Sequence, residues 1–269
     1  MLAAIKRAVP YDAKCQLLRH WRGLGNRFRK ARYQKFLFLL CAPYSGSTLL
    51  HELLSTSPQV SANNIFGTRE GQSLPEYRKL IDYRQRWEEG HNLPWEAIRQ
   101  VWMQYWDISK PILLDKSPPN LMHTAAIQQH FSPAYFIAMT RNPYAHCESL
   151  HRRDQMSIEE AAKFSLRCLQ YHRRNIEKCP NLLCFRYEDL MEEPDRVQQQ
   201  IQDFLPQLGP LEMKRHFKAH NFKNKRLPLS NLNAEKIARL SIQQRQKINR
   251  IWGAHTDLLA YFDYPLLVD

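Results

Sequence analysis

Residues 43–48 form a short polar loop that is suited to binding a phosphate-like anion. The loop follows a continuous apolar run, residues 36–42, and leads into a segment with the apolar spacing of a helix, residues 46–55. The first backbone N–H groups of a helix have no partner within the helix, so they can bind an anion. Gly46 allows a close backbone approach. Three hydroxyl side chains stand beside it, those of Ser45, Ser47 and Thr48. We therefore expect an anion site here, although an ordinary helix start would give the same pattern.

The same loop lacks the lysine that a nucleotide-triphosphate loop requires. In the pattern GxxxxGK[ST], that lysine binds the β- and γ-phosphates, and Ser47 stands at its position here. The upstream glycine of the pattern is also missing. We therefore expect a ligand other than a nucleoside triphosphate.

A second set of residues suited to an anion lies further along the chain. The apolar run 135–139 predicts a buried strand, Asn142 can cap a helix, and Pro143 suits the first turn of that helix. Arg141 would then lie at the carboxyl end of the strand, where open α/β sheets bind their ligands. Ser149 follows eight residues later, about two helical turns on. A forked guanidinium contact together with a hydroxyl can hold one phosphate.

Alternating strands and helices must position these residues. We expect strands at 36–41, 112–114, 135–139 and 182–185, and helices at 46–55, 121–130, 143–153, 195–204 and 237–252. This alternation is typical of a parallel sheet that helices cover on both faces. The sequence therefore predicts an α/β fold of three layers.

We expect residues 1–269 to form a single domain with two additions. Residues 1–34 are interpreted as a basic N-terminal arm, and residues 72–110 as a mostly helical insertion. Three tryptophans of the insertion share one helical face, which is more typical of a core than of a cofactor site: Trp95, Trp102 and Trp106.

The chain carries a large excess of positive charge. It has 39 lysines and arginines against 26 acidic residues, and a net charge of +13. Such a charge indicates an anionic partner, and nucleic acid, a membrane surface or a polyanionic small molecule would all fit. No nucleic-acid-binding module accompanies the charge, so we expect no nucleic-acid partner.

Trp21 and nearby leucines of the N-terminal arm have approximately helical spacing, so the arm is expected to pack on the domain or to contact an anionic surface.

Cysteine and histidine usage gives no sign of a disulfide framework or a metal site. The six cysteines include no CxxC pair, which indicates buried, reduced thiols. The histidines form no HExxH motif. The longest apolar run, residues 36–42, is far shorter than the roughly 20 residues of a membrane span, and no secretory signal is visible. We expect a soluble, cytoplasmic protein.

Four motifs resemble those of sulfotransferases that use 3′-phosphoadenosine-5′-phosphosulfate (PAPS), especially the membrane-type and bacterial branch of that family. They are the loop at 43–48, the segment DKSPPN at 115–120, the pair Arg141 and Ser149, and the segment RYEDL at 186–190. Each motif alone is loose, whereas four in the expected order are specific. The resemblance implies the P-loop-NTPase-like fold of the family. It also implies transfer of a sulfuryl group from PAPS, as co-substrate, to a hydroxyl or amine of a sugar, lipid or small molecule.

The resemblance assigns roles to individual residues. Those implied at the 5′-phosphosulfate are Tyr44, Ser45, Gly46, Ser47 and Thr48. Arg141 and Ser149 would hold the 3′-phosphate, and Tyr187 would lie near the adenine. Lys116 matches a catalytic lysine, whose charge stabilises the bridging oxygen as its bond to sulfur breaks. Lysine and backbone donors would replace Mg²⁺, so no metal ion is implied.

The general base that removes the proton of the acceptor is indicated less directly. In cytosolic relatives it is a histidine two residues after the lysine, and Pro118 stands at that position here. A related branch uses a glutamate after the first helix, and Glu70 lies in the comparable region. His51 and His123 are alternative candidates.

Tyr44 is the main departure from the family pattern, because its position usually holds an arginine or lysine that reaches the donor. Lys116, Arg69 or the basic segment 223–226 can supply the missing cation. Otherwise the enzyme is slow, or the chain binds nucleotide or nucleic acid without catalysis. The other enzymatic alternative is a kinase-like phosphotransferase in which Asp115 holds Mg²⁺.

Overall fold

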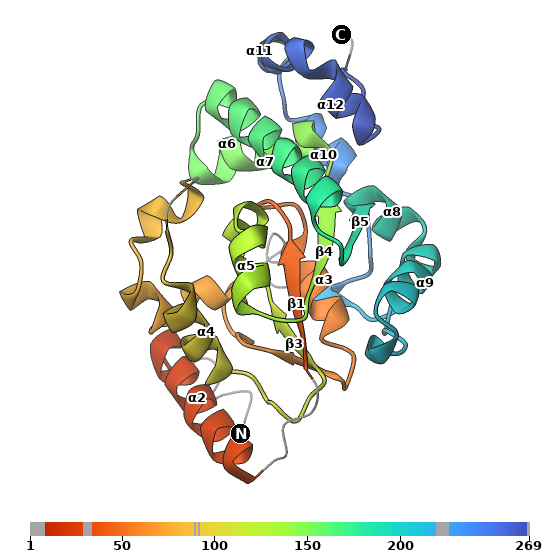
Figure 1. Cartoon of the computed structure of the whole chain (residues 1–269). Helices are drawn as coiled ribbons and strands as arrows, with labels where there is room; N and C mark the ends of the chain where they lie inside the picture. Colours follow the sequence, from red (N-terminus) through yellow and green to blue (C-terminus); the bar gives the residue numbers. More distant parts are fainter. Residues whose placement is uncertain (1–8, 29–33, 89, 91, 219–225, 268–269) are drawn as a thin grey trace.

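The computed structural model describes residues 9–28, 34–88, 90, 92–218 and 226–267, and it places a five-stranded parallel sheet at the centre of the chain (Figure 1). The spatial order of the strands is β2-β3-β1-β4-β5. Their bounds are β1 (Lys35–Leu40), β2 (Val60–Ala62), β3 (Ile112–Asp115), β4 (Ala134–Thr140) and β5 (Leu182–Arg186). The four expected strands are therefore confirmed. The edge strand β2 was not expected, because a strand of three residues is too short to show a pattern in the sequence.

Helices cover both faces of the sheet, because alternate side chains of each strand are apolar on both sides. Phe36, Phe38 and Leu40 of β1 pack with α4, α5 and α7 on one face. Leu37 and Leu39 pack with α3, α8 and α9 on the other face. These helices are α3 (Ser47–Leu54), α4 (Trp95–Met103), α5 (Thr124–His130), α7 (Ile158–Lys178), α8 (Tyr187–Glu192) and α9 (Pro194–Phe204). The expected three-layer α/β fold is confirmed.

A third apolar cluster holds the C-terminal helices against α6 (Pro143–Asp154) and α7. These helices are α10 (Asn233–Ile237), α11 (Ile242–Trp252) and α12 (Thr256–Tyr261). Tyr144 and Trp252 meet edge to face in this cluster, with ring centroids 4.8 Å apart. In Figure 1, α11 and α12 lie at the end of the molecule remote from α2.

Two helix predictions need correction. A single helix over residues 237–252 is wrong, because Ser241 caps a new helix by accepting a hydrogen bond from the backbone N–H of Gln244. Similarly, the expected helix at 121–130 is α-helical only from Thr124, after a 3₁₀ segment, Pro118–Met122. The sequence analysis also overlooked α7, whose start carries a capping box of Ser157 and Glu160.

The insertion at 72–110 contains α4 and three short 3₁₀ segments, η1 (Gly71–Ser73), η2 (Tyr77–Lys79) and η3 (Tyr83–Trp87). Its three expected core tryptophans are all buried. None of the six cysteines, all within the described ranges, forms a disulfide.

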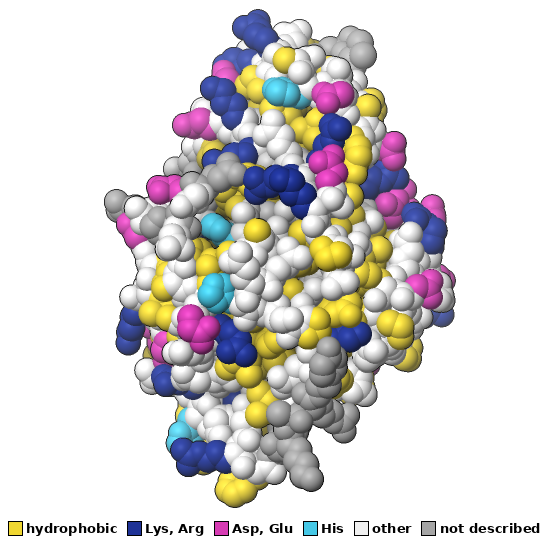
Figure 2. All heavy atoms as spheres, viewed as in Figure 1, with side chains coloured by type: hydrophobic (Ala, Val, Ile, Leu, Met, Phe, Trp, Pro, Cys, Tyr) yellow, Lys and Arg dark blue, Asp and Glu magenta, His cyan; other side chains and the backbone are white. Residues whose placement is uncertain are grey.

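The N-terminal helix α2 (Tyr11–Phe28) packs beside α4 (Figure 1). Of the expected arm, residues 1–8 and 29–33 lie outside the described residues. None of the helices within the described ranges is both long and apolar enough to cross a membrane. On the face of the molecule in Figure 2, lysines and arginines are dispersed among acidic side chains instead of forming one basic patch.

Candidate functional site

A cleft of about 940 Å³ opens at the carboxyl ends of β1, β3 and β4. Eight of the ten residues singled out in the sequence line it: Tyr44, Gly46, Ser47, Thr48, Glu70, Lys116, Arg141 and Tyr187. The other two, Ser45 and Ser149, are buried and do not line it. The parallel sheet therefore brings together groups that are up to 143 positions apart, from Tyr44 to Tyr187.

The first loop has the backbone geometry of an anion site. Gly46 is the N-cap of α3 with φ of 100° and makes no side-chain cap, so the first N–H groups of the helix keep their donor capacity. A Cβ at Gly46 would lie 2.9 Å from the Tyr187 ring, so only glycine fits here. The hydroxyl of Ser45 turns away and donates to the carbonyl oxygen of Ala42 at 2.5 Å.

Lys116 and Glu70 form an ion pair at the floor of the cleft. The Lys116 Nζ lies 3.0 Å from Glu70 Oε1, and it also donates to the Thr48 hydroxyl at 3.4 Å. Gln72 donates to the other carboxylate oxygen, Oε2, at 2.6 Å. The Lys116 side chain is only 2% exposed and that of Glu70 14% exposed. A cation, a carboxylate and the first loop therefore meet at one point.

Asp115 holds this arrangement in place, a role that its position in the sequence does not reveal. Its carboxylate is fully buried and accepts hydrogen bonds from Asn63 at 2.8 Å and from Asn120 at 2.6 Å. It also accepts from the backbone N–H of Gly71 at 3.1 Å, which ties the residue after Glu70 to the residue before Lys116. Asp115 also accepts a hydrogen bond from the Ser117 hydroxyl, its fourth donor. Burial raises the pKa of Asp115 above its ordinary value, although the four hydrogen bonds act in the opposite direction.

The same contacts explain why Gly71 must be a glycine. A Cβ at this position would lie 2.1 Å from the Asp115 Oδ1 and 2.7 Å from the indole nitrogen of Trp102. Neither group can move away, because both belong to the buried core beneath the cleft.

Arg141 lies at the other end of the cleft with an incomplete set of partners. Its Nε donates to Asn233 at 2.7 Å, and its Nη1 donates to the Tyr44 carbonyl at 3.0 Å. Its Nη2 is buried and has no hydrogen-bond partner among the described residues. The guanidinium lies 4.1 Å from the Tyr187 ring centroid. Because buried donors are normally satisfied, the open Nη2 indicates a place for an acceptor from a ligand.

Lys236 is a second cation at this end, and the sequence analysis missed it. The residue is 4% exposed, and its Nζ donates to the Ser149 hydroxyl at 2.6 Å. Burial, followed by the nearby charge of Arg141, lowers the pKa of Lys236 to about 7. Its burial depends on the packing of α10 against α6, which no local pattern in the sequence indicates. A buried lysine beside a buried arginine indicates an anionic ligand between them.

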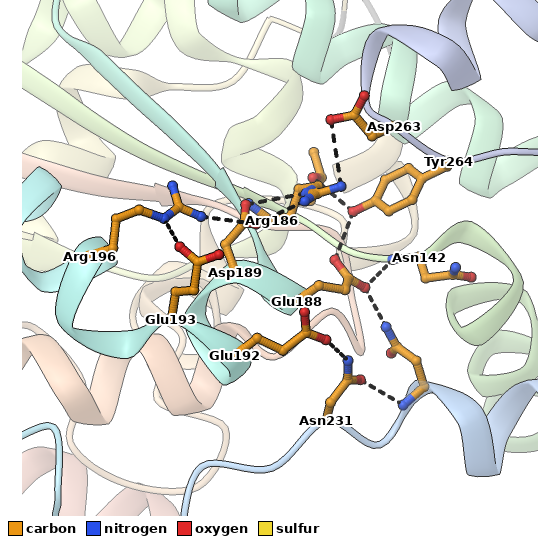
Figure 3. A network of polar contacts seen from close by, with 12 residues as sticks. Asn142, Arg186, Glu188, Asp189, Glu192, Glu193, Arg196, Asn231, Asp263 and Tyr264 are labelled. Carbon is orange, nitrogen blue, oxygen red and sulfur yellow. Dashed lines mark hydrogen bonds and ion pairs between the residues drawn. The ribbon is translucent and has the colours of Figure 1, made fainter.

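Glu188 joins segments that support Arg141, and Figure 3 shows its contacts with Asn142 and Tyr264. Its carboxylate accepts from the backbone N–H of Asn142 at 2.9 Å, from the Tyr264 hydroxyl at 3.0 Å, and from the side chain of Asn233. Asn233 in turn accepts from Arg141. The start of α8, the start of α6 and the C-terminal segment therefore fix the guanidinium together.

Tyr44 directs its hydroxyl to the rim of the cleft, where it donates to Asp154. Its backbone has φ of 60°, and burial together with Asp154 raises the pKa of its phenol to about 12. The guanidinium of Arg153 lies 4.9 Å from the ring centroid of Tyr44 and also lines the cleft. A cation therefore stands beside Tyr44 even so, supplied by Arg153 of α6.

Of the other cations considered for Tyr44 from the sequence, Arg69 lies away from the cleft. Arg69 pairs with Glu52 on α3 and is absent from the cleft lining. Burial and Arg215 lower the pKa of Arg69 to about 10. In the segment 223–226, residues 223–225 lie outside the described residues.

The alternative bases also lie away from the cleft. Both ring nitrogens of His51 are buried without a partner among the described residues, and burial holds its pKa well below the ordinary value. The His123 ring packs against Trp95, with centroids 5.6 Å apart. Only Glu70 of the three candidates lines the cleft.

The opposite wall of the cleft is mostly apolar, with two arginines. Residues of η3, α6 and α7 and the turn between these helices form it: Arg86, Trp87, Leu150, Arg153, Met156 and Phe164. Trp87 and Phe164 meet edge to face at 5.1 Å, which joins the insertion to α7.

Comparison with known proteins identifies relatives of this arrangement. A family model described as the sulfotransferase family matches residues 37–207. A sulfotransferase domain from the curacin biosynthetic pathway has a TM-score of 0.55 and 18% identity, covering 88% of this chain and 100% of that one. The sulfotransferase domain of the Synechococcus PCC 7002 olefin synthase has a TM-score of 0.51 and 21% identity, and the match covers 88% of this chain and 98% of that one.

A sulfotransferase from Alicyclobacillus acidocaldarius has a TM-score of 0.50 and 14% identity, and the match covers 88% of this chain and 98% of that one. The comparison with curated sequences gives no match. At these identities the solved structures show the fold, and they confirm the P-loop-like sulfotransferase fold implied by the sequence motifs.

Proposed function

Since the chain belongs to the sulfotransferase family and is therefore a transferase of sulfuryl groups, we propose that its donor is PAPS, bound between two separate anion sites. The observation that carries this proposal is the buried pair of cations, Arg141 and Lys236, which adds a second cationic group beside a phosphate loop that lacks the triphosphate lysine. A nucleotide with phosphate groups at both its 5′ and 3′ positions satisfies both sites.

The first loop would hold the 5′-phosphosulfate. The N–H groups at the start of α3 and the hydroxyls of Ser47 and Thr48 provide donors. Lys116 lies within hydrogen-bond distance of Thr48, so its charge is placed beside the same group. These donors replace the metal ion that a triphosphate site uses, and we expect no metal ion to take part.

Arg141, Lys236 and Ser149 would hold the 3′-phosphate. The open Nη2 of Arg141 offers a donor, and the ammonium of Lys236 already contacts the Ser149 hydroxyl. Tyr187 lies between the two sites, against both Gly46 and Arg141, which supports a place for it beside the adenosine.

The chemical step would be an in-line displacement at sulfur. The acceptor oxygen or nitrogen forms a bond to sulfur while the bond from sulfur to the bridging oxygen breaks. 3′-Phosphoadenosine-5′-phosphate (PAP) leaves with the electron pair, and Glu70 takes the proton of the acceptor. Lys116 would stabilise the charge on the departing oxygen. The hydrogen bonds from Lys116 and Gln72 support Glu70 as the base, because they fix its carboxylate.

The acceptor would enter along the apolar wall formed partly by the insertion. Trp87 and Phe164 provide aromatic surface, and Arg86 and Arg153 provide charge. A sugar, lipid or small molecule with a hydroxyl or amine would fit these groups.

A kinase reaction is less well supported. Asp115, the residue that would hold Mg²⁺, is fully buried and already accepts four hydrogen bonds. It would have to lose these bonds to bind a metal ion.

Thermal unfolding with different ligands tests the donor. We expect PAP to raise the melting temperature in proportion to the logarithm of its concentration, because it binds only the folded chain. ATP with Mg²⁺ and a mixed-sequence oligonucleotide are the comparison ligands. Stabilisation by ATP with Mg²⁺ but not by PAP would contradict the proposed donor.

A further inference from the structure

Helix α2 exposes a continuous apolar face to solvent. Leu17 is 64% exposed, Trp21 58%, Leu24 44% and Phe28 88%. The four residues follow one another at steps of four, three and four positions, so they lie on one face of the helix. We call these four residues the outer face of α2.

The opposite side of α2 is fixed to the protein, so the outer face is not the result of a loosely attached helix. Cys15 and Leu18 are buried in the main core. The Arg22 guanidinium pairs with Asp107 at 2.9 Å, and the Asn26 amide donates to the carbonyl oxygen of Trp106 at 2.9 Å.

Exposed apolar side chains are concentrated on this helix. Among the described residues, seven large apolar side chains are exposed, and four of them form the outer face. The other three stand on separate elements, Ile65, Ile242 and Tyr261. Scattered exposure of that kind is ordinary, whereas a patch on one element marks an interaction surface.

The side chains beside the outer face are basic. Lys14 lies one turn before Leu17, His20 lies between Leu17 and Leu24, and Arg27 lies next to Phe28. His20 and Arg27 are exposed, so they border the face.

The one acidic residue of α2 forms an ion pair with the folded domain. This residue is Asp12, and it pairs with Arg78 of the folded domain at 2.5 Å. An apolar face with a cationic border is the pattern of helices that lie in the interface of an anionic bilayer.

We propose that the outer face of α2 docks the protein on an anionic lipid surface. The apolar side chains would enter the boundary between headgroups and acyl chains, and the bordering cations would lie at the level of the lipid phosphates. A protein partner would not by itself explain why the border is cationic. This inference does not depend on the proposed donor or acceptor.

Trp21 gives a direct signal for docking. The other five of the six tryptophans are buried or partly buried, so Trp21 is the exposed one. We expect its fluorescence to shift to shorter wavelength when the full chain is mixed with vesicles of phosphatidylcholine containing about 30% phosphatidylserine. Vesicles of phosphatidylcholine alone should give a much smaller shift, because the bordering cations then meet no net charge.

Co-sedimentation with the same vesicles identifies the residues responsible. We expect the double variant Leu24→Gln, Phe28→Gln to bind at least about tenfold more weakly. Arg27→Gln should weaken binding severalfold and make it less sensitive to salt. Ile242→Gln is the matched control, since Ile242 is 56% exposed on α11, and it should bind as the wild type does. Circular dichroism confirms that each variant is folded.

Three results would overturn the inference. The first is the absence of binding to the anionic vesicles, and the second is unchanged binding of the double variant. The third is a dimer by analytical ultracentrifugation that the double variant abolishes, which would assign the outer face to a second copy of the chain.

Discussion

Replacing Lys236 with methionine should make the free protein more stable and its nucleotide binding weaker. Lys236 is 4% exposed, and among the described residues its Nζ donates a hydrogen bond to the Ser149 hydroxyl. Burial is the main reason that its pKa falls to about 7, and the neighbouring Arg141 charge adds to the effect. Without a ligand, the positive charge of Lys236 is therefore a cost to folding.

The pH dependence of that cost follows from the two pKa values of Lys236. In the unfolded chain the pKa is near its ordinary value of 10.5, and in the folded protein it is about 7. Between these values the unfolded chain binds more protons, so the free energy of unfolding rises with pH. The cost is fully present below pH 7. A difference of about 3.5 in pKa corresponds to at most about 5 kcal/mol. Lys236→Met should therefore stabilise the free protein by up to this amount at pH 6, and by much less near pH 10.

Nucleotide affinity should change in the opposite direction. A charge-assisted contact to phosphate contributes about 1.5–3 kcal/mol, which corresponds to about a 10- to 150-fold loss of PAP affinity in the variant. In the wild type, Lys236 must take up a proton above pH 7 to bind the phosphate as a cation. PAP affinity should therefore decrease from pH 7 to pH 9 in the wild type, and it should change much less in the variant.

Titration calorimetry with PAP and urea unfolding, each at pH 6 and pH 9, measure the two effects. Lys247→Met is the matched control, because Lys247 is exposed and pairs with Glu159 at 2.7 Å on the surface. The reasoning is refuted if Lys236→Met binds PAP as tightly as the wild type at pH 6. It is also refuted if the free variant is less stable than the wild type at that pH.

Three further substitutions test the floor and the rim of the cleft. Glu70→Gln should reduce transfer from ³⁵S-labelled PAPS at least about 100-fold while leaving PAP affinity unchanged; unchanged turnover would place the base elsewhere. Tyr44→Phe should change PAP affinity less than about threefold by calorimetry, because its hydroxyl is bonded to Asp154; a tenfold loss would indicate that the hydroxyl contacts the donor. Gly71→Ala should lower the urea-unfolding free energy by about 2 kcal/mol or more, since its Cβ would lie 2.1 Å from the Asp115 Oδ1; a stability equal to the wild type would show that the loop can shift.

Local patterns in the sequence predicted the elements that lead into the site. The apolar runs before Pro43 and Arg141 are continuous because both faces of a parallel strand are buried, and they became β1 and β4. Gly46 and Asn142 were recognisable because a tight turn and a helix cap each require particular residue types. These features depend on neighbours in the chain, so the sequence alone could reveal them.

Features that depend on distant contacts were missed. Lys236 lies near Arg141 only because α10 packs on α6, which the helix pattern around it does not indicate. Asp115 was considered as a metal ligand, but its carboxylate bonds to Asn63 and to the backbone of Gly71, and thereby positions the floor of the cleft. Arg153 reaches Tyr44 from the far end of α6.

The same limitation explains the error in the C-terminal helix. Its apolar period continues from residue 237 to residue 252, yet Ser241 caps a new helix within that range. The break lets α10 place Lys236 beneath the cleft while α11 packs on α7. Continuous periodicity does not exclude a change of direction between two helices.

Titration calorimetry of PAP and adenosine 5′-phosphate with the wild type and Arg141→Ala tests the two separate anion sites most directly. The two ligands differ only in the 3′-phosphate. We expect the wild type to bind PAP at least about 100-fold more tightly, and Arg141→Ala to lose most of that difference. Affinity for adenosine 5′-phosphate should change less than about threefold in the variant, because its phosphate would lie at the first loop. Equal losses for both ligands, or equal affinity for both in the wild type, would contradict a separate 3′-phosphate site at Arg141.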